Sequence, residues 1–120
     1  MNRFLLISIF TFLLSPAFSQ NKKALIVAIS DYPKASGFRG INANNDIPII
    51  QSALIKLGFS EKNISILKNE GATKKLILNA LQNDFLKSLN KGDIAYFHFS
   101  GHGQQVQDLN GDELDGYDEA

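Results

Sequence analysis

A histidine between two glycines is the residue of this chain best placed to do chemistry. His102 stands in Ser100-Gly101-His102-Gly103, after an apolar run that begins at Ile94. The run predicts a buried strand, and chemistry in open α/β sheets sits at the carboxyl ends of strands. Because histidine titrates near neutral pH, His102 is a candidate general base, and the glycines leave room for a substrate backbone. The alternative is that His102 only ends a strand; the glycines and the acidic segment that follows favour a catalytic role.

The segment after this histidine is rich in acidic side chains. It holds six carboxylates: Asp108, Asp112, Glu113, Asp115, Asp118 and Glu119. Their repulsion disfavours a compact loop unless a cation neutralises them, and oxygen ligands without histidine or cysteine suit calcium better than zinc. One alternative is a solvated acidic loop. Another is an EF-hand loop starting at Asp108, but Glu113 stands where that loop needs glycine, and a strand precedes it instead of a helix.

Alternating strands and helices must position these residues. Short apolar runs predict strands, and apolar residues at helical spacing predict helices. The predicted order is strand 25–29, helix 46–57, strand 63–67, a helix capped by Thr73 and running to Leu89, and a strand from Ile94. This alternation predicts parallel strands joined by right-handed crossovers, and therefore an α/β sheet whose carboxyl ends share one edge. His102 lies at that edge.

Three segments resemble the caspase-like cysteine peptidases, and most closely the metacaspase branch. Ser100-Gly101-His102-Gly103 followed by Tyr117-Asp118 is similar to the segment of that family that carries the catalytic histidine, with Phe99 in place of the usual tyrosine. Residues 23–32 are similar to the family's first strand. Residues 39–46, in which a glycine precedes Asn-Asp at a helix start, are similar to its next signature. Together the matches cover residues 22–119.

The resemblance implies a fold, an activity and a set of site residues. The fold is a caspase-like α/β sandwich with a mainly parallel central sheet flanked by helices, incomplete in this chain. The activity is that of a cysteine-type endopeptidase that cleaves after Arg or Lys with a His/Cys dyad. His102 would be the general base and the Gly103 N–H an oxyanion-hole donor. Asp46 and Ser100 would line an acidic substrate pocket, and Asp118 would bind an activating calcium ion, with the carboxylates before it mostly solvated. For Asp46, a plain helix-start role favoured by the helix dipole is an equal alternative.

The chain contains no cysteine. In caspase-type enzymes the nucleophile follows the histidine by roughly 50 residues, and Ala120 comes before that point. We therefore expect residues 20–120 to be the amino-terminal part of a peptidase domain that stops before its nucleophile. Without a thiolate this part should be inactive. The alternative is a secreted caspase-like pseudoenzyme, or a calcium-binding module, without peptidase activity.

The first 19 residues have the pattern of a secretory signal peptide. Arg3 precedes an apolar stretch from Phe4 to Leu14, and small residues precede a predicted cleavage between Ser19 and Gln20. A membrane anchor would need about 20 apolar residues. The expected location is therefore periplasmic or extracellular, with no membrane association after cleavage.

The charge balance bears on the choice of partner. Lys and Arg number 12 and Asp and Glu number 12, with no basic run. This composition argues against a nucleic-acid partner. The resemblance to the cysteine peptidases implies a polypeptide substrate. No pattern specifies an oligomeric state.

Overall fold

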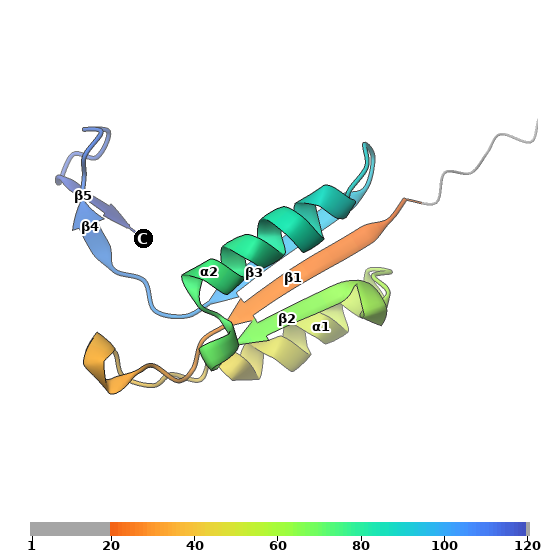
Figure 1. The fold of residues 1–120 in the computed structure, drawn as a ribbon, viewed down its shortest axis with the longest axis horizontal. Helices are drawn as coiled ribbons and strands as arrows, with labels where there is room; N and C mark the ends of the chain where they lie inside the picture. The colour runs from red at the N-terminus through yellow and green to blue at the C-terminus, as the bar shows by residue number, and fades with distance from the viewer. Residues whose placement is uncertain (1–19, 120) are drawn as a thin grey trace, which may run out of the picture.

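A three-stranded parallel sheet forms the centre of the molecule in the computed structural model, which describes residues 20–119 (Figure 1). The strands are β1 (Lys22–Ala28), β2 (Ile64–Lys68) and β3 (Ile94–Ser100), in the order β2-β1-β3. In the register, Ile26 of β1 pairs with Ile66 of β2 and with His98 of β3. The predicted parallel α/β architecture is confirmed.

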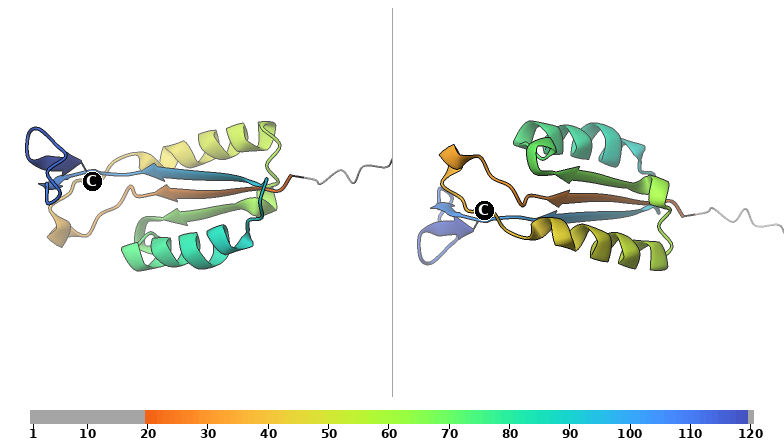
Figure 2. Two further views of the ribbon diagram at one scale, coloured as in Figure 1. Left: turned by 90° about the horizontal axis from the view of Figure 1, so that it is seen from above. Right: turned by 90° about the horizontal axis from the view of Figure 1, so that it is seen from below.

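Helices cover the two faces of this sheet (Figure 2). Helix α1 (Asp46–Lys56) lies on one face, and α2 (Lys74–Asn79) lies on the other. α2 continues through a π-helical turn, η5 (Ala80–Phe85), and a 3₁₀ turn, η6 (Leu86–Ser88). The other 3₁₀ turns are η1 (Lys34–Ser36), η2 (Ala43–Asn45), η3 (Glu61–Asn63) and η4 (Asn69–Gly71). As predicted, Thr73 caps α2: its hydroxyl accepts the Leu76 N–H at 3.3 Å.

The central strand is the most buried element. Residues 24–28 of β1 are at most 1 % exposed, as expected for a parallel strand covered on both faces. Ile26 packs with Leu54 and Phe59 on the α1 side, whereas Leu25 and Val27 pack with residues such as Phe85 on the α2 side. Burial of each large apolar side chain contributes about 1.5–3 kcal/mol. These two clusters fix the sheet whose carboxyl edge carries His102.

The predicted helix 46–57 ends one residue early. Its residues Ile47, Ile50 and Leu54 face the sheet at helical spacing. Leu57, the last residue of the predicted helix, is 64 % exposed, because α1 ends at Lys56 and Gly58 turns the chain with a φ of +85°.

The acidic segment forms an antiparallel hairpin that the sequence did not predict. Strands β4 (Gln105–Gln107) and β5 (Tyr117–Glu119) pair through Val106 and Asp118. The hairpin extends past the carboxyl end of β3 (Figure 1). Gly111 and Gly116, with φ of +76° and +79°, turn the chain between the two strands.

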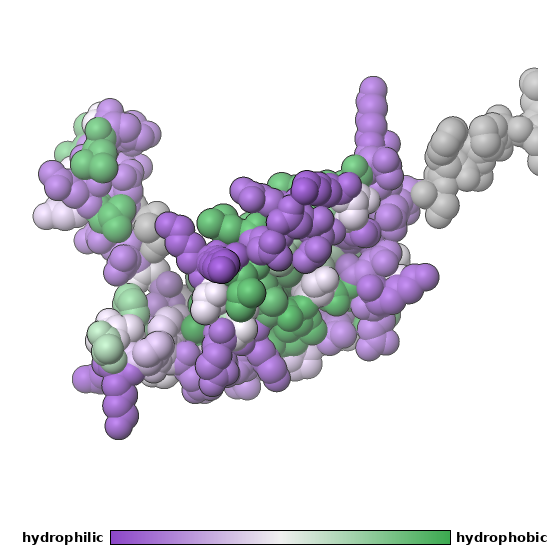
Figure 3. Space-filling model, viewed as in Figure 1, coloured by the Kyte–Doolittle hydropathy of each residue, from purple (hydrophilic) through white to green (hydrophobic). Residues whose placement is uncertain are grey.

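The outer surface is hydrophilic over much of α2, and apolar groups gather between α2 and the sheet in the view of Figure 3. Both edges of the sheet lack a further strand within residues 20–119. On the β3 edge, Phe97 and Phe99 are 46 % and 48 % exposed.

None of the helices in the described part is long and apolar enough to cross a membrane. The predicted signal peptide, residues 1–19, lies outside the described residues.

Candidate active site

The imidazole of His102 is held by a backbone carbonyl. Its Nε2 lies 2.8 Å from the carbonyl oxygen of Arg39, in the loop between β1 and α1. A carbonyl oxygen only accepts hydrogen bonds, so we assign the proton of the neutral ring to Nε2. Nδ1 is then the nitrogen that can accept a proton. The ring is half-buried, and in this tautomer Nδ1 has the orientation that the predicted role as a base requires.

Two aromatic side chains from the same loop pack on this ring. The Phe38 ring stacks on His102 with centroids 5.0 Å apart and an interplanar angle of 16°, and the Tyr32 ring lies 4.9 Å away. The Tyr32 hydroxyl also accepts the backbone N–H of His102 at 2.7 Å. Sequence reasoning gave Tyr32 no role and did not single out Phe38 or Arg39, because contacts between residues so far apart in the chain leave no local pattern.

Gly101 makes room for these contacts. A Cβ placed on it would lie 3.0 Å from the Tyr32 hydroxyl and 3.0 Å from the ring of Phe99. The sequence predicted that this glycine clears space for a substrate. In the structure the space next to it is filled by the chain's own side chains. Gly103, on the other side of His102, is exposed.

Asp46 and Ser100 are brought into direct contact. The Ser100 hydroxyl donates to the Asp46 carboxylate at 2.5 Å, and both residues are half-buried. Ser100 is the last residue of β3, and Asp46 is the first residue of α1. Asp46 therefore occupies the helix-start position and also faces the end of the strand that carries His102, so both predicted roles are compatible with its placement.

The acidic segment brings together three of its carboxylates. One oxygen from each of Asp108, Asp112 and Asp118 lies within 4.8 Å of the others. Such a set of hard oxygen ligands fits calcium. The segment follows strand β4 and ends in strand β5, whereas helices flank an EF-hand loop.

Asp108 differs from the expectation that the carboxylates before Asp118 are mostly solvated. Its oxygens accept the backbone N–H groups of Gly111 at 2.6 Å, Asn110 at 2.9 Å and Glu113 at 3.1 Å. These hydrogen bonds, those of Gly111 and Glu113 foremost, hold the pKa of the Asp108 carboxyl below its usual range. The Asp108 carboxylate therefore stabilises the conformation of the acidic loop through hydrogen bonds to its backbone.

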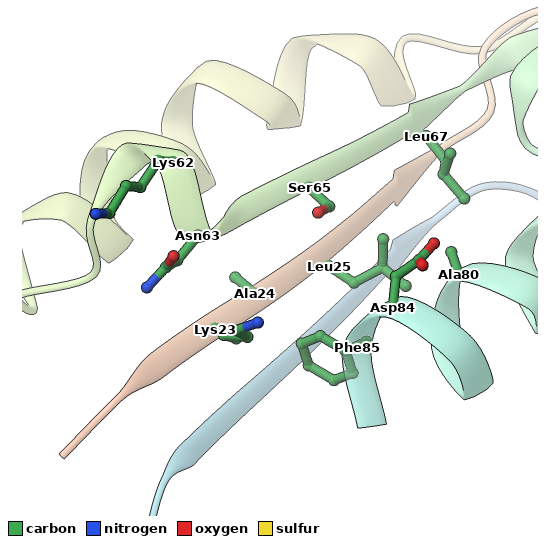
Figure 4. A pocket seen from close by; sticks show the side chains of 10 residues that line it. All are labelled: Lys23, Ala24, Leu25, Lys62, Asn63, Ser65, Leu67, Ala80, Asp84 and Phe85. Atoms are coloured by element: carbon green, nitrogen blue, oxygen red, sulfur yellow. The ribbon is translucent and has the colours of Figure 1, made fainter. Parts of the chain in front are cut away.

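Two cavities flank the sheet, and they differ in their relation to His102. One, of about 290 Å³, lies between the strands and η5, where Asp84 and Phe85 point toward β1 (Figure 4). None of the candidate site residues lines it. The other, of about 400 Å³, is lined by Tyr32 together with Asp31 and Asn69. It therefore adjoins the candidate site at the carboxyl edge of the sheet.

Comparisons with known proteins identify the family to which this chain is similar. A family model described as metacaspase, peptidase C14 domain, matches residues 22–120. Metacaspase-1 of Meyerozyma guilliermondii is 37% identical over 108 residues, which are 84% of this chain and 26% of the relative. Metacaspase-1 of Yarrowia lipolytica is 36% identical over 108 residues, which are 84% of this chain and 23% of the relative. The chain thus spans about a quarter of the length of these curated relatives.

A solved structure shares the fold. The crystal structure of a Geobacter sulfurreducens protein superposes with a TM-score of 0.64 and 30% sequence identity, over 82% of this chain and 38% of the other. Together with the parallel sheet flanked by helices, this match supports the predicted caspase-like α/β fold class.

Proposed function

The chain belongs to the metacaspase family of peptidase C14 domains, and we propose that it supplies the histidine half of a cysteine endopeptidase site. One observation carries the proposal. The His102 ring, at the carboxyl edge of the sheet, donates from Nε2 to the Arg39 carbonyl and so keeps Nδ1 for a proton from a nucleophile.

In the proposed reaction, Nδ1 of His102 takes the proton of a cysteine thiol, and the thiolate attacks the scissile carbonyl. The Arg39 carbonyl stabilises the resulting imidazolium by accepting its Nε2–H. The Gly103 N–H stabilises the negative charge on the substrate oxygen. The chain has no cysteine, so the nucleophile in this proposal comes from a segment outside residues 1–120.

We propose cleavage after Arg or Lys. The Asp46 carboxylate, in contact with the Ser100 hydroxyl, is the physical complement of a guanidinium or ammonium group. Asp46→Asn should then weaken cleavage after basic residues in the complete enzyme. A preference of that enzyme for aspartyl substrates would contradict this assignment.

We also propose calcium as an activating ion, held by Asp118 together with Asp108 and Asp112. The spacing of their oxygens, within 4.8 Å, supports such a site. Bound calcium would neutralise the carboxylates and so order the segment that follows His102.

Export is the remaining proposal. We infer that residues 1–19 act as a signal peptide and that the mature chain begins at Gln20, because the apolar stretch 4–14 is flanked by Arg3 and by small residues. Mass spectrometry of the exported protein tests this. An amino terminus at Met1, or retention in the cytoplasm, would contradict it.

The deciding experiment for the activity is to sequence the coding DNA beyond the codon of Ala120. A reading frame with a cysteine roughly 50 residues after His102 supports the peptidase. That protein should then hydrolyse arginyl and lysyl reporters and lose this activity on His102→Ala. A serine or glycine at the nucleophile position would instead favour the pseudoenzyme.

The chain of residues 1–120 provides the control. It should hydrolyse neither reporter, since it lacks a thiol. Turnover by this chain that is lost on His102→Ala would contradict the assignment of His102 as the base for a cysteine.

A further inference from the structure

One asparagine side chain joins three segments at the carboxyl edge of the sheet. Asn69 follows β2, and its Oδ1 accepts the backbone N–H groups of Ser30 at 3.0 Å and Asp31 at 3.3 Å, both just after β1. The same oxygen accepts the Nδ2–H of Asn44, in η2, at 3.2 Å. Its own Nδ2 donates to the Asp31 carboxylate at 2.6 Å. A single amide therefore links the ends of β1 and β2 to the turn that precedes α1.

The backbone at this position also requires a particular residue type. Asn69 has a φ of +47° and is the one non-glycine residue with positive φ in residues 20–119. Asparagine tolerates this left-handed conformation better than most residues. Glycine would accept the backbone but lacks the amide. Asparagine meets both needs.

The first segment that Asn69 holds leads to His102. Its bonds to Ser30 and Asp31 fix the chain immediately before Tyr32. The Tyr32 hydroxyl accepts the His102 N–H at 2.7 Å, and the Tyr32 ring packs on the imidazole. The orientation of the proposed base therefore depends on where this loop leaves β1.

The second segment leads to Asp46. Asn44 donates its side-chain N–H to Asn69 and its backbone N–H to the Ser30 hydroxyl at 2.7 Å. The Asn44 Oδ1 is buried and has no partner within the described residues. The bond to Asn69 is thus the one that orients this side chain. Asp46, two residues later, begins α1 and contacts Ser100.

We propose that Asn69 is a positioning residue, whose amide sets the proposed base His102 and the proposed pocket residue Asp46 relative to each other. It touches neither residue directly and acts through Tyr32 and Asn44. The catalytic meaning of this role rests on the proposed function. The effect of Asn69 on the relative positions of His102 and Asp46 does not rest on the proposed function, so it can be tested without peptidase activity.

The test uses NMR spectra of the full ¹⁵N-labelled chain. In Asn69→Gly, the backbone conformation is allowed and the amide is lost. We expect shifted signals of Tyr32, Ser100 and His102, and about tenfold faster hydrogen exchange at the His102 N–H, the factor that matches loss of one hydrogen bond. Unchanged signals of these three residues in a folded variant would overturn the proposal.

Asn63→Ala is the matched control. The Asn63 amide also joins β1 to β2, through the Asn21 side chain at 3.1 Å and the Lys22 carbonyl at 3.2 Å, at the opposite end of the strands. Its loss should weaken the fold without moving the signals of His102. Equal changes at His102 in both variants would reduce Asn69 to a general structural role and overturn the proposal.

A paired exchange covers the case in which Asn69→Gly fails to fold. Asn69→Asp alone sets a second carboxylate against that of Asp31 and should disturb His102. The double variant Asn69→Asp with Asp31→Asn exchanges amide and carboxylate across the same 2.6 Å contact. It should restore the His102 signals, and failure to restore them in a folded protein would contradict the proposal. In a complete active enzyme, the same rescue of kcat would show the catalytic consequence separately.

Discussion

In the proposed site, the position of the proton on the His102 ring decides which nitrogen can act as a base. The Arg39 carbonyl, 2.8 Å from Nε2, has no proton to give, so Nε2–H is the donor and Nδ1 is the basic nitrogen. Phe38 and Tyr32 hold the plane of the ring. The direction of Nδ1 is therefore set by contacts with one loop, residues 32–39.

Gly101 should be intolerant of even one added methyl group. A Cβ there would sit 3.0 Å from the Tyr32 hydroxyl and from the Phe99 ring, so Gly101→Ala must displace one of them. We expect a loss of about 1–3 kcal/mol in the free energy of unfolding, measured by urea titration. Gly71→Ala is the control, because a Cβ there meets nothing within 4 Å. A neutral Gly101→Ala would contradict the packing described around Tyr32.

At the scale of elements, one carboxylate joins the residue before β1 to the turn before β3. Asp93, just before β3, accepts the N–H of Asn90 at 2.8 Å and of Asn21 at 2.9 Å, and these bonds hold the pKa of its carboxyl below its usual range. A group with a lowered pKa in the folded state stabilises the fold above its ordinary pKa and loses this effect as pH falls through the folded value. The chain should therefore lose stability below about pH 4.

The variant Asp93→Asn tests this pH dependence. It should lower the free energy of unfolding at pH 7 and flatten its decline between pH 4 and pH 2, as measured by urea titrations across that range. Asp108, whose carboxyl pKa is also lowered, should leave a residual decline. A decline of the free energy of unfolding between pH 4 and pH 2 that is as steep in Asp93→Asn as in the parent chain would contradict the role of Asp93.

The hairpin formed by β4 and β5 should respond to calcium. We expect calcium binding by the 120-residue chain, detected by calorimetry. Asp118→Asn should abolish it, and Asp108→Asn should weaken it because the Asp108 carboxylate also holds the loop. Asp115→Asn, outside the cluster of three, is the control. Equal sensitivity of all three variants would indicate a diffuse acidic surface instead of a site.

The elements that follow a local pattern were predictable, and those that depend on distant contacts were not. β1, α1 and β3 arise from apolar periodicity, and the motif around His102 lies within a few residues of sequence. The hairpin has no apolar alternation strong enough to predict it; Val106 is its apolar residue in β4. The contact of His102 with the Arg39 carbonyl and the hydrogen bonds of the Asn69 side chain join residues from separate loops. Their partners are set by the register of the parallel strands, which no local pattern specifies.

At the scale of the whole molecule, the β3 edge of the sheet exposes apolar side chains. β3 pairs only with β1 within the described residues, and its Phe97 and Phe99 are close to half exposed. An unpaired edge of this kind is a common site of association between chains. The apolar surface that stabilises the chain is mostly that of β1 and its two clusters.

We therefore expect the 120-residue chain to be marginally stable, with a free energy of unfolding below about 5 kcal/mol. The reason is that apolar side chains of an edge strand contribute little while water covers them. Reversible urea unfolding followed by circular dichroism at several protein concentrations measures this value. The double variant Phe97→Thr with Phe99→Thr should cost little stability, whereas Val27→Ala, at a site 0 % exposed, should cost about 2 kcal/mol or more. Two-state unfolding above 5 kcal/mol, or equal losses in both variants, would mean that β3 is covered in solution by a contact absent from the described fold.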